Sequence, residues 1–237
     1  MTRRRWIADE VAGDRAALTG AHAAHLSRVL RVQAGQEFDI ACGDVVRSGI
    51  VSAVSDERVE FELGAQVPAT VTTPITLLMA VYKFDRMEWA IEKCTELNVT
   101  SIVPVIARRT EKHLAQAAAK RVERWRRIAR EASEQSRRIA APEIAAPVKL
   151  TGALSSGAEL QVVLDETEQE PNLKDMLRSR SQASSIALAI GPEGGWTLEE
   201  LQLFREAGWL PASLGDTILR AETAAIAALA IAKAELD

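Results

Sequence analysis

The 237-residue sequence is poor in the side chains that build metal sites and disulfide frameworks. It has two cysteines, Cys42 and Cys94, and three histidines, His22, His25 and His113. None of them has the close spacing of Cys and His ligands that a zinc site needs. Lone cysteines are typical of a reducing compartment, so we expect a cytoplasmic protein without a bound metal.

Long apolar runs and the common nucleotide-binding motifs are also missing. No apolar run approaches the roughly 18 residues of a membrane span, and no apolar stretch follows Arg3–Arg5, so we expect neither a membrane segment nor a secretory signal. The pattern G-x-x-x-x-G-K-[ST] does not occur, which excludes a P-loop. No glycine motif follows Ile75–Val81, which argues against a nicotinamide-dependent oxidoreductase; titration with that cofactor would test this alternative.

The charge is unevenly distributed. The segment Arg108–Arg138 holds eleven Lys and Arg against four Asp and Glu, a local charge of +7, so the remainder carries −11 to give the net charge of −4. A cluster of this kind favours binding of a polyanion, because local potential rather than net charge attracts it. The alternative is a basic helix face exposed to solvent.

Two regions differ in their hydrophobic pattern. Up to about Val67 the sequence predicts β-structure: Val59–Leu63 alternates apolar and polar residues, and Glu37–Ala41 and Val45–Val54 read as further strands. A short helix is expected over residues 21–30, and residues 64–74 are the best linker candidate. We therefore expect one domain over residues 1–70 and a second over residues 74–237.

From Ile75 onward, strand-like and helix-like segments alternate. Apolar, strand-like runs lie at Ile75–Val81, Ser101–Ile106, Leu160–Leu164, Ser185–Ile190 and Leu210–Leu214. Between the first three, Met87, Ala90, Ile91, Cys94 and Leu97 share one helix face, as do Val122, Trp125, Ala129 and Ala132. The fold class is therefore predicted to be α/β, with a mainly parallel sheet covered by helices on both sides.

The most informative glycines come late, in Ile190-Gly-Pro-Glu-Gly-Gly195, directly after an apolar strand. Thr197 and Glu200 then form a predicted capping box at the start of a helix that Gly208 ends. Three glycines in five residues let the backbone approach a flat ligand closely. The alternative is a tight turn that merely connects strand and helix.

A second loop, Leu214–Arg220, follows the last predicted strand and leads into an alanine-rich helix. Glu222 lies in the first turn of that helix, where the helix dipole favours a carboxylate. Ile218 and Leu219 are apolar residues in a loop. They either cover a flat ring such as adenine or pack against the sheet.

The two loops, GPEGG and LG-x-x-ILR-x-ETA, resemble the C-terminal signature of the RsmE family within the SPOUT superfamily. Four further motifs occur in the family's order: Arg5-Trp6 with His25–Arg31, then Lys83–Trp89, Glu92–Leu97, and Arg124–Pro142. The resemblance implies a PUA-like β-barrel for RNA docking and an α/β domain with a C-terminal trefoil knot. It also implies a homodimer that uses S-adenosylmethionine to methylate N3 of a uridine in 16S ribosomal RNA of the small ribosomal subunit.

The resemblance also implies roles for individual residues. Cofactor contact is expected for Ile190, Gly191, Gly194, Gly195, Leu214, Gly215, Ile218 and Leu219, and also for Leu164 and Asp165. Uracil N3 carries a proton, so arginines could stabilise the anion that its loss produces; the catalytic candidates are Arg109, Arg138 and Arg220, with Glu222 as a residue that orients Arg220 or as a base. The RNA-binding candidates are Arg3, Arg4, Arg5, Arg28, Arg31, Arg121 and Arg124.

The sequence departs from the family pattern in three places. Phe84 and Asn98 replace usual glycines, and Asp216-Thr217 replaces the usual Pro-Arg. The last change removes a basic residue near the expected cofactor or RNA. A SPOUT enzyme with another acceptor, such as a ribose 2′-hydroxyl or a transfer RNA, and a non-catalytic RNA-binding module are therefore open alternatives.

Overall fold

The structure is a computed structural model that describes residues 5–43, 45–68, 72–167 and 170–236. The chain divides into two compact units. Unit 1 comprises residues 1–71 and 133–141, and unit 2 comprises residues 72–132 and 142–237. The inclusion of residues 133–141 in unit 1 was not predicted from the sequence.

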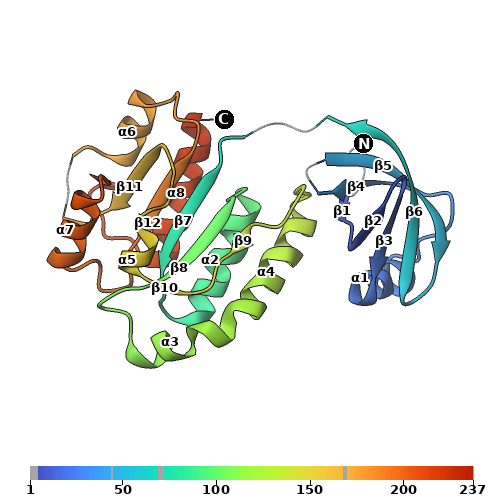
Figure 1. Cartoon of the computed structure of the whole chain (residues 1–237), viewed down its shortest axis with the longest axis horizontal. Coiled ribbons are helices and arrows are strands. Elements are labelled where there is room, and N and C mark those ends of the chain that lie inside the picture. The colour runs from blue at the N-terminus through green and yellow to red at the C-terminus, as the bar shows by residue number, and fades with distance from the viewer. Residues whose placement is uncertain (1–4, 44, 69–71, 168–169, 237) are drawn as a thin grey trace. The chain divides into compact units, whose positions relative to one another are not determined.

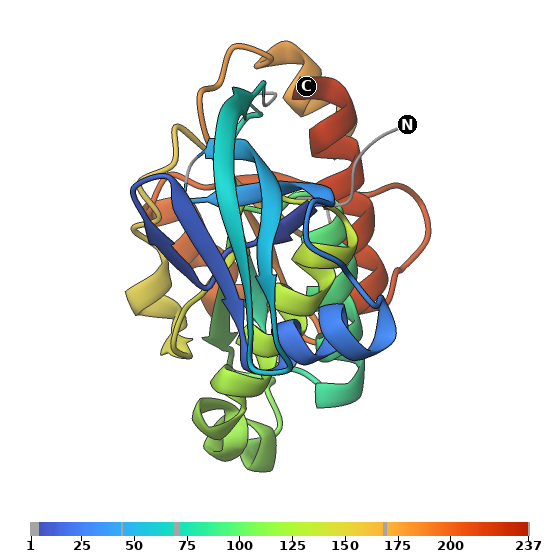
Figure 2. The same ribbon diagram turned by 90° about the vertical axis from the view of Figure 1, so that its right-hand side faces the viewer.

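Unit 1 is built on a six-stranded sheet with the strand order β1-β4-β5-β6-β3-β2. All neighbouring strands are antiparallel except β1 and β4, which are parallel. The two longest strands, β5 and β6, form the twisted pair that Figure 2 shows in cyan and blue. The strands are β1 Arg5–Ile7, β2 Glu10–Ala12, β3 Arg15–Thr19, β4 Glu37–Cys42, β5 Val45–Val54 and β6 Arg58–Val67.

Strand β6 confirms the predicted alternation and corrects the predicted linker. Val59, Phe61 and Leu63 are buried in the core of unit 1, as the pattern predicts. The strand then continues to Val67, which pairs with Val46, so the prediction of a linker beginning at Gly64 is wrong. A Cβ at position 64 would lie 2.5 Å from the Ser48 hydroxyl, so glycine allows the close approach of β5 and β6 there.

The helix expected over residues 21–30 has an irregular form. It begins as α1, Gly20–Ala24, and continues as one π-helical turn, His25–Val29. Its buried members, Ala23 and Leu26, pack into the core of unit 1. The predicted helix is therefore confirmed in position, with a wider last turn than a regular α-helix.

Unit 2 contains a seven-stranded sheet in which every pair of neighbours is parallel. The strand order is β10-β8-β7-β12-β11-β13, with β9 beside β8. This confirms the predicted parallel sheet. The strands are β7 Ile75–Ala80, β8 Ser101–Ile106, β9 Glu143–Ile144, β10 Val148–Lys149, β11 Leu160–Leu164, β12 Ile186–Ile190 and β13 Leu210–Ala212.

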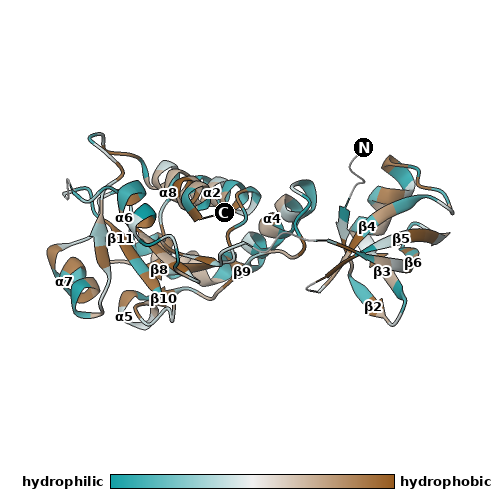
Figure 3. Cartoon of the chain, turned by 90° about the horizontal axis from the view of Figure 1, so that it is seen from above, coloured by the Kyte–Doolittle hydropathy of each residue, from teal (hydrophilic) through white to brown (hydrophobic). Residues whose placement is uncertain are grey.

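Helices cover both faces of this sheet, as Figure 1 shows. Side chains alternate along β7: Leu77 and Met79 pack with α2, α4, α6 and α8, whereas Leu78 and Ala80 pack with α5 and α7. The strands at the centre of unit 2 are accordingly coloured as hydrophobic in Figure 3. The helices are α2 Phe84–Glu96, α3 Lys112–Ala117, α4 Val122–Gln135, α5 Leu150–Ala153, α6 Leu173–Ser179, α7 Leu198–Glu206 and α8 Ala221–Leu236.

The two predicted helix faces are buried as expected. Met87, Ala90, Ile91 and Cys94 of α2 are fully buried, and Trp125 of α4 is among the largest fully buried side chains of unit 2. Helix α2 ends before Asn98, which has a φ of 66°, the left-handed stop predicted there. Within the described residues, no helix is long and apolar enough to span a membrane.

The strand order determines where loops meet. Strands β11, β12 and β13 are widely separated in sequence, but β11 lies between the other two. Since the strands are parallel, their carboxyl ends lie at one edge of the sheet. The segments that follow them, starting at Asp165, Gly191 and Ser213, are thereby brought together.

Candidate functional site

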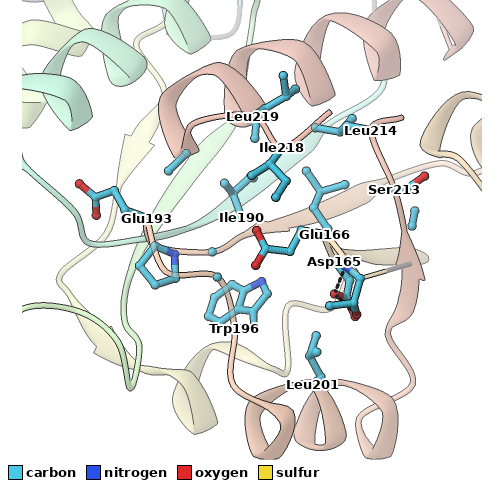
Figure 4. Close-up of a pocket in the computed structure, with 18 of the residues that line it drawn as sticks. Asp165, Glu166, Ile190, Glu193, Trp196, Leu201, Ser213, Leu214, Ile218 and Leu219 are labelled. Atoms are coloured by element: carbon cyan, nitrogen blue, oxygen red, sulfur yellow. Dashed lines mark hydrogen bonds between the residues drawn. The ribbon is translucent and has the colours of Figure 1, made fainter. Parts of the chain in front are cut away.

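A pocket of about 350 Å³ lies at the carboxyl ends of β11, β12 and β13 (Figure 4). All of its lining belongs to unit 2. The loops after these three strands, the segment after β8 and the starts of α7 and α8 contribute. The lining residues are Arg109, Leu164–Thr167, Ile190–Glu193, Gly195, Trp196, Leu198, Leu201, Ala212–Leu219, Ala221 and Ala224.

The loop after β12, Gly191–Gly195, is called the glycine loop, and it folds tightly on itself. The Gly195 amide donates a hydrogen bond to the Pro192 carbonyl at 2.8 Å, and Gly195 has a φ of 69°, in the left-handed region that favours glycine. A Cβ on Gly191 would lie 3.4 Å from the Gly195 backbone. Glycine is therefore required at position 195 by the turn, and the two ends of the loop come into van der Waals contact at Gly191.

The predicted capping box fixes the end of this loop. The Thr197 hydroxyl accepts a hydrogen bond from the Glu200 amide at 3.3 Å, and the Glu200 carboxylate accepts one from the Thr197 amide at 2.9 Å. The other carboxylate oxygen of Glu200 accepts a hydrogen bond from the Arg108 amide at 2.8 Å. Glu200 therefore caps α7 and also ties it to the segment after β8.

Arg109 reinforces the same connection. Its Nη1 donates hydrogen bonds to the carbonyls of Gly194 and Trp196. The guanidinium therefore contributes to holding the glycine loop in place. Gly194, a predicted cofactor contact, is not part of the pocket lining and instead receives this hydrogen bond.

The second loop forms the opposite wall. Gly215 has a φ of 110°, and Leu214 and Leu219 point into the pocket in Figure 4. Ile218 lines the pocket although its side chain is 80% exposed. An exposed isoleucine at the mouth of a pocket is available to cover a bound ligand.

The pocket contains more negative than positive charge. Asp165, Glu166, Glu193 and Asp216 contribute carboxylates, whereas Arg109 is the one cationic side chain in the lining of described residues. A pocket of this sign favours a ligand with a positive charge.

Two polar atoms in the pocket lack partners. Asp165 is 4% exposed, and its Oδ1 accepts hydrogen bonds from the amide and hydroxyl of Thr167 at 2.9 and 2.7 Å. Its Oδ2 and the Trp196 Nε1 are buried without a hydrogen-bond partner among the described residues. A buried unpaired polar atom costs roughly 1–3 kcal/mol, so these atoms suit a ligand that supplies the missing donor and acceptor. S-adenosylmethionine carries both kinds of group and a positive charge, and therefore fits the pocket.

Glu222 lies outside the lining, in the first turn of α8. It is 6% exposed, and its Oε1 lies 3.7 Å from Arg86 Nη1 of α2, whereas Oε2 has no hydrogen-bond partner among the residues that the structure describes. The sequence suggested Arg220 as its partner; the structure places Arg86 there instead, because α2 and α8 pack together. Arg86 was not singled out from the sequence.

The two remaining catalytic candidates, Arg220 and Arg138, do not line the pocket. Arg220 is an exposed residue immediately before α8. Arg138 belongs to unit 1, where its Nε donates a hydrogen bond to the Ala140 carbonyl at 3.1 Å. Burial lowers the pKa of Arg138 to about 10, so its guanidinium still carries a proton at neutral pH.

Most RNA-binding candidates make ion pairs. Arg5 lies near Asp39, and Arg28 lies near Asp56. Arg121 and Arg124 both lie near Glu88, and the Arg121 guanidinium is 4.8 Å from the centre of the Phe84 ring. For Arg31, no side-chain partner is found within the described part of the chain, and Arg3 and Arg4 lie outside it.

In the described residues, the structure brings together nine of the ten cofactor candidates, namely Leu164, Asp165, Ile190, Gly191, Gly195, Leu214, Gly215, Ile218 and Leu219. The sequence analysis missed Glu166, Thr167, Trp196 and Ser213, which also line the pocket. The sequence held one signal that could have identified them: they lie in the same loops as the predicted cofactor contacts, or next to the strands before those loops.

No group of three or more His, Cys, Asp or Glu side chains that could hold a metal ion occurs in the described part of the chain.

Comparison with known proteins gives similarities over the whole chain. A family model described as an RNA methyltransferase domain matches residues 70–233. Ribosomal RNA small subunit methyltransferase E from Synechocystis sp. is 37% identical over 229 residues, which cover 93% of this chain and 73% of that protein.

Two solved structures are similar over both units. The first is ribosomal RNA small subunit methyltransferase E from Neisseria gonorrhoeae bound to S-adenosyl methionine, with a TM-score of 0.86, 29% identity, and coverage of 100% of this chain and 98% of that one. The second is a putative methyltransferase from Legionella pneumophila in complex with the bound cofactor SAM, with a TM-score of 0.84, 30% identity, and coverage of 99% and 98%.

Proposed function

Because this chain belongs to the RNA methyltransferase family of the ribosomal RNA small subunit methyltransferase E type, we propose that it transfers a methyl group from S-adenosylmethionine to N3 of a uridine in 16S ribosomal RNA. The pocket at the carboxyl ends of β11, β12 and β13 is the observation that carries this proposal. It is acidic, contains buried polar atoms without partners, and is lined by the glycine loop and by the second loop, Leu214–Leu219. The proposed substrate, the small ribosomal subunit, is cytoplasmic, and so is the proposed location of the protein.

The proposal includes three features of architecture. The sheet of unit 1 acts as a PUA-like barrel that docks RNA. The segment from β13 to α8 forms part of a trefoil knot. The active form is a homodimer.

When bound, S-adenosylmethionine supplies an activated methyl group, so the protein mainly has to align the acceptor and exclude water. Ile218 and Leu219 cover the pocket, and the glycine loop provides a rigid wall. Arg220 stabilises negative charge on the uracil oxygens as the N3 proton leaves. Arg109 positions the glycine loop, and Glu222 with Arg86 positions the first turn of α8.

The function is tested by methyl transfer to small ribosomal subunits that lack the modification. With labelled S-adenosylmethionine, we expect label in 16S ribosomal RNA, and mass mapping of the digested RNA should place it on a uracil base. Label on a ribose or in transfer RNA would support another acceptor instead. Failure to bind S-adenosylmethionine would favour a non-catalytic RNA-binding module.

If S-adenosylmethionine binds in this pocket, Gly195→Ala should weaken its binding. The new Cβ would lie 2.8 Å from the Glu166 carboxylate, and alanine is strained at a φ of 69°. We expect the dissociation constant for S-adenosylmethionine, measured by isothermal titration calorimetry, to rise at least about tenfold, which corresponds to about 1.4 kcal/mol.

Gly157→Ala is the matched control for this variant. Gly157 has a similar φ of 71°, but nothing lies within 4 Å of a Cβ there, and it does not line the pocket. Both variants carry the same backbone penalty, so the control should lose stability without losing affinity. Equal affinities of the two variants would contradict the placement of the cofactor at Gly195.

A further inference from the structure

Glu166 is an exposed residue in the lining of the pocket. It follows β11 and Asp165, and Figure 4 shows its side chain between Trp196 on one side and Ile190 and Ile218 on the other. Within the described residues, its carboxylate makes no hydrogen bond or ion pair. A charged group in this position is available to a ligand.

The surroundings of Glu166 leave its charge uncompensated. The neighbouring carboxylate of Asp165 is buried with Oδ2 unpaired. The guanidinium of Arg109 is directed at the carbonyls of Gly194 and Trp196. Neither carboxylate therefore has a cationic partner within the described residues, and a bound cation would supply one.

The indole of Trp196 completes the arrangement. It is 7% exposed, lines the pocket, and is held by an edge-to-face contact with Phe204 at 5.0 Å between ring centres. An aromatic ring beside a carboxylate is a combination that recognises onium cations, because both present negative potential to the ligand. Neutral ligands of the same shape gain much less from it.

We infer that Glu166, supported by Asp165 and Trp196, is a specificity-determining residue that makes the pocket prefer the positively charged methyl donor over its neutral product. The inference rests on the proposed function. During transfer the bond between the methyl carbon and the acceptor nitrogen forms as the bond between the sulfonium sulfur and that carbon breaks. The sulfur keeps the electron pair of the broken bond and becomes a neutral thioether, and the proton of the acceptor nitrogen leaves to solvent water. A carboxylate that faces the sulfur therefore binds the reactant more tightly than S-adenosylhomocysteine.

The test compares the two ligands by isothermal titration calorimetry on the full chain. In the wild type we expect S-adenosylmethionine to bind at least about tenfold more tightly than S-adenosylhomocysteine, a difference of about 1.4 kcal/mol. In Glu166→Gln, which keeps the size of the side chain and removes its charge, this ratio should fall to about twofold or less because only the cation loses an attraction. Sinefungin carries a protonated amine in place of the sulfonium. Its affinity should therefore fall in Glu166→Gln by about the same factor as that of S-adenosylmethionine.

Glu206→Gln is the matched control, since it makes the same change of charge on the exposed surface of α7, outside the pocket lining. It should leave the ratio unchanged. An equal loss of affinity for both ligands in Glu166→Gln would overturn the inference, because the carboxylate would then contact a group that both share. An unchanged ratio would also overturn it while leaving the proposed function intact, whereas a wild type that binds neither ligand would reject the proposed function itself.

Discussion

Replacing Arg220 by alanine is expected to lower the turnover of methyl transfer by about 100-fold or more, the usual cost of removing a donor to developing negative charge. Arg220 is exposed at the start of α8, next to the pocket residues Leu219 and Ala221. Since it does not line the pocket, the dissociation constant for S-adenosylmethionine should change by no more than about twofold, or about 0.4 kcal/mol. Single-turnover transfer to small subunits and calorimetric titration of the cofactor measure the two quantities separately.

The control for this prediction is Arg180→Ala. Arg180 is an exposed arginine at the end of α6 and does not line the same pocket. Its loss should affect neither turnover nor cofactor binding. Wild-type turnover in Arg220→Ala would reject the assigned role, and Arg220→Lys should restore little activity, because lysine lacks the planar set of donors that arginine presents.

The largest effect on stability is expected for Trp125→Ala in α4. The Trp125 side chain is fully buried and makes an edge-to-face contact with Phe84 at 6.0 Å between ring centres. Removing a buried aromatic side chain of this size leaves a cavity and costs about 3–5 kcal/mol of unfolding free energy. Urea unfolding followed by far-ultraviolet circular dichroism measures the loss.

Trp89→Ala provides the comparison, since Trp89 in α2 is 48% exposed. Its replacement should cost less than about 1 kcal/mol, because little apolar surface is removed from the core. The chain has two units, so the destabilised transition in Trp125→Ala should be that of unit 2. A similar cost for both tryptophans would show that the packing around α4 is not as described.

Local signals in the sequence predicted much of the fold. The spacing of Met87, Ala90, Ile91 and Cys94 predicted α2, because a buried face repeats with the period of a helix. The Thr197–Glu200 pattern predicted the start of α7, because its hydrogen bonds join residues three apart. These features depend on neighbours in the chain, which the sequence gives directly.

The resemblance to a family supplied the cofactor and nine of the residues that line the pocket. It did not supply Glu166, because nothing local distinguishes a ligand-facing carboxylate after β11 from an ordinary exposed one. It also did not give the pairing of Glu222 with Arg86, since this pairing follows from the packing of α8 on α2. Each of these contacts joins residues that are distant in sequence.

The sequence by itself therefore determined most of the longer helices and strands, the parallel character of the sheet of unit 2, the two loops at the pocket and the concentration of arginine before residue 139. The tertiary structure decided which elements are neighbours: β11 lies between β12 and β13, so the loops after these three strands meet, and Arg109 reaches the carbonyls of the glycine loop. The physical reason is that hydrophobic periodicity specifies which face of an element is buried, whereas the partner it is buried against depends on the packing of the whole chain.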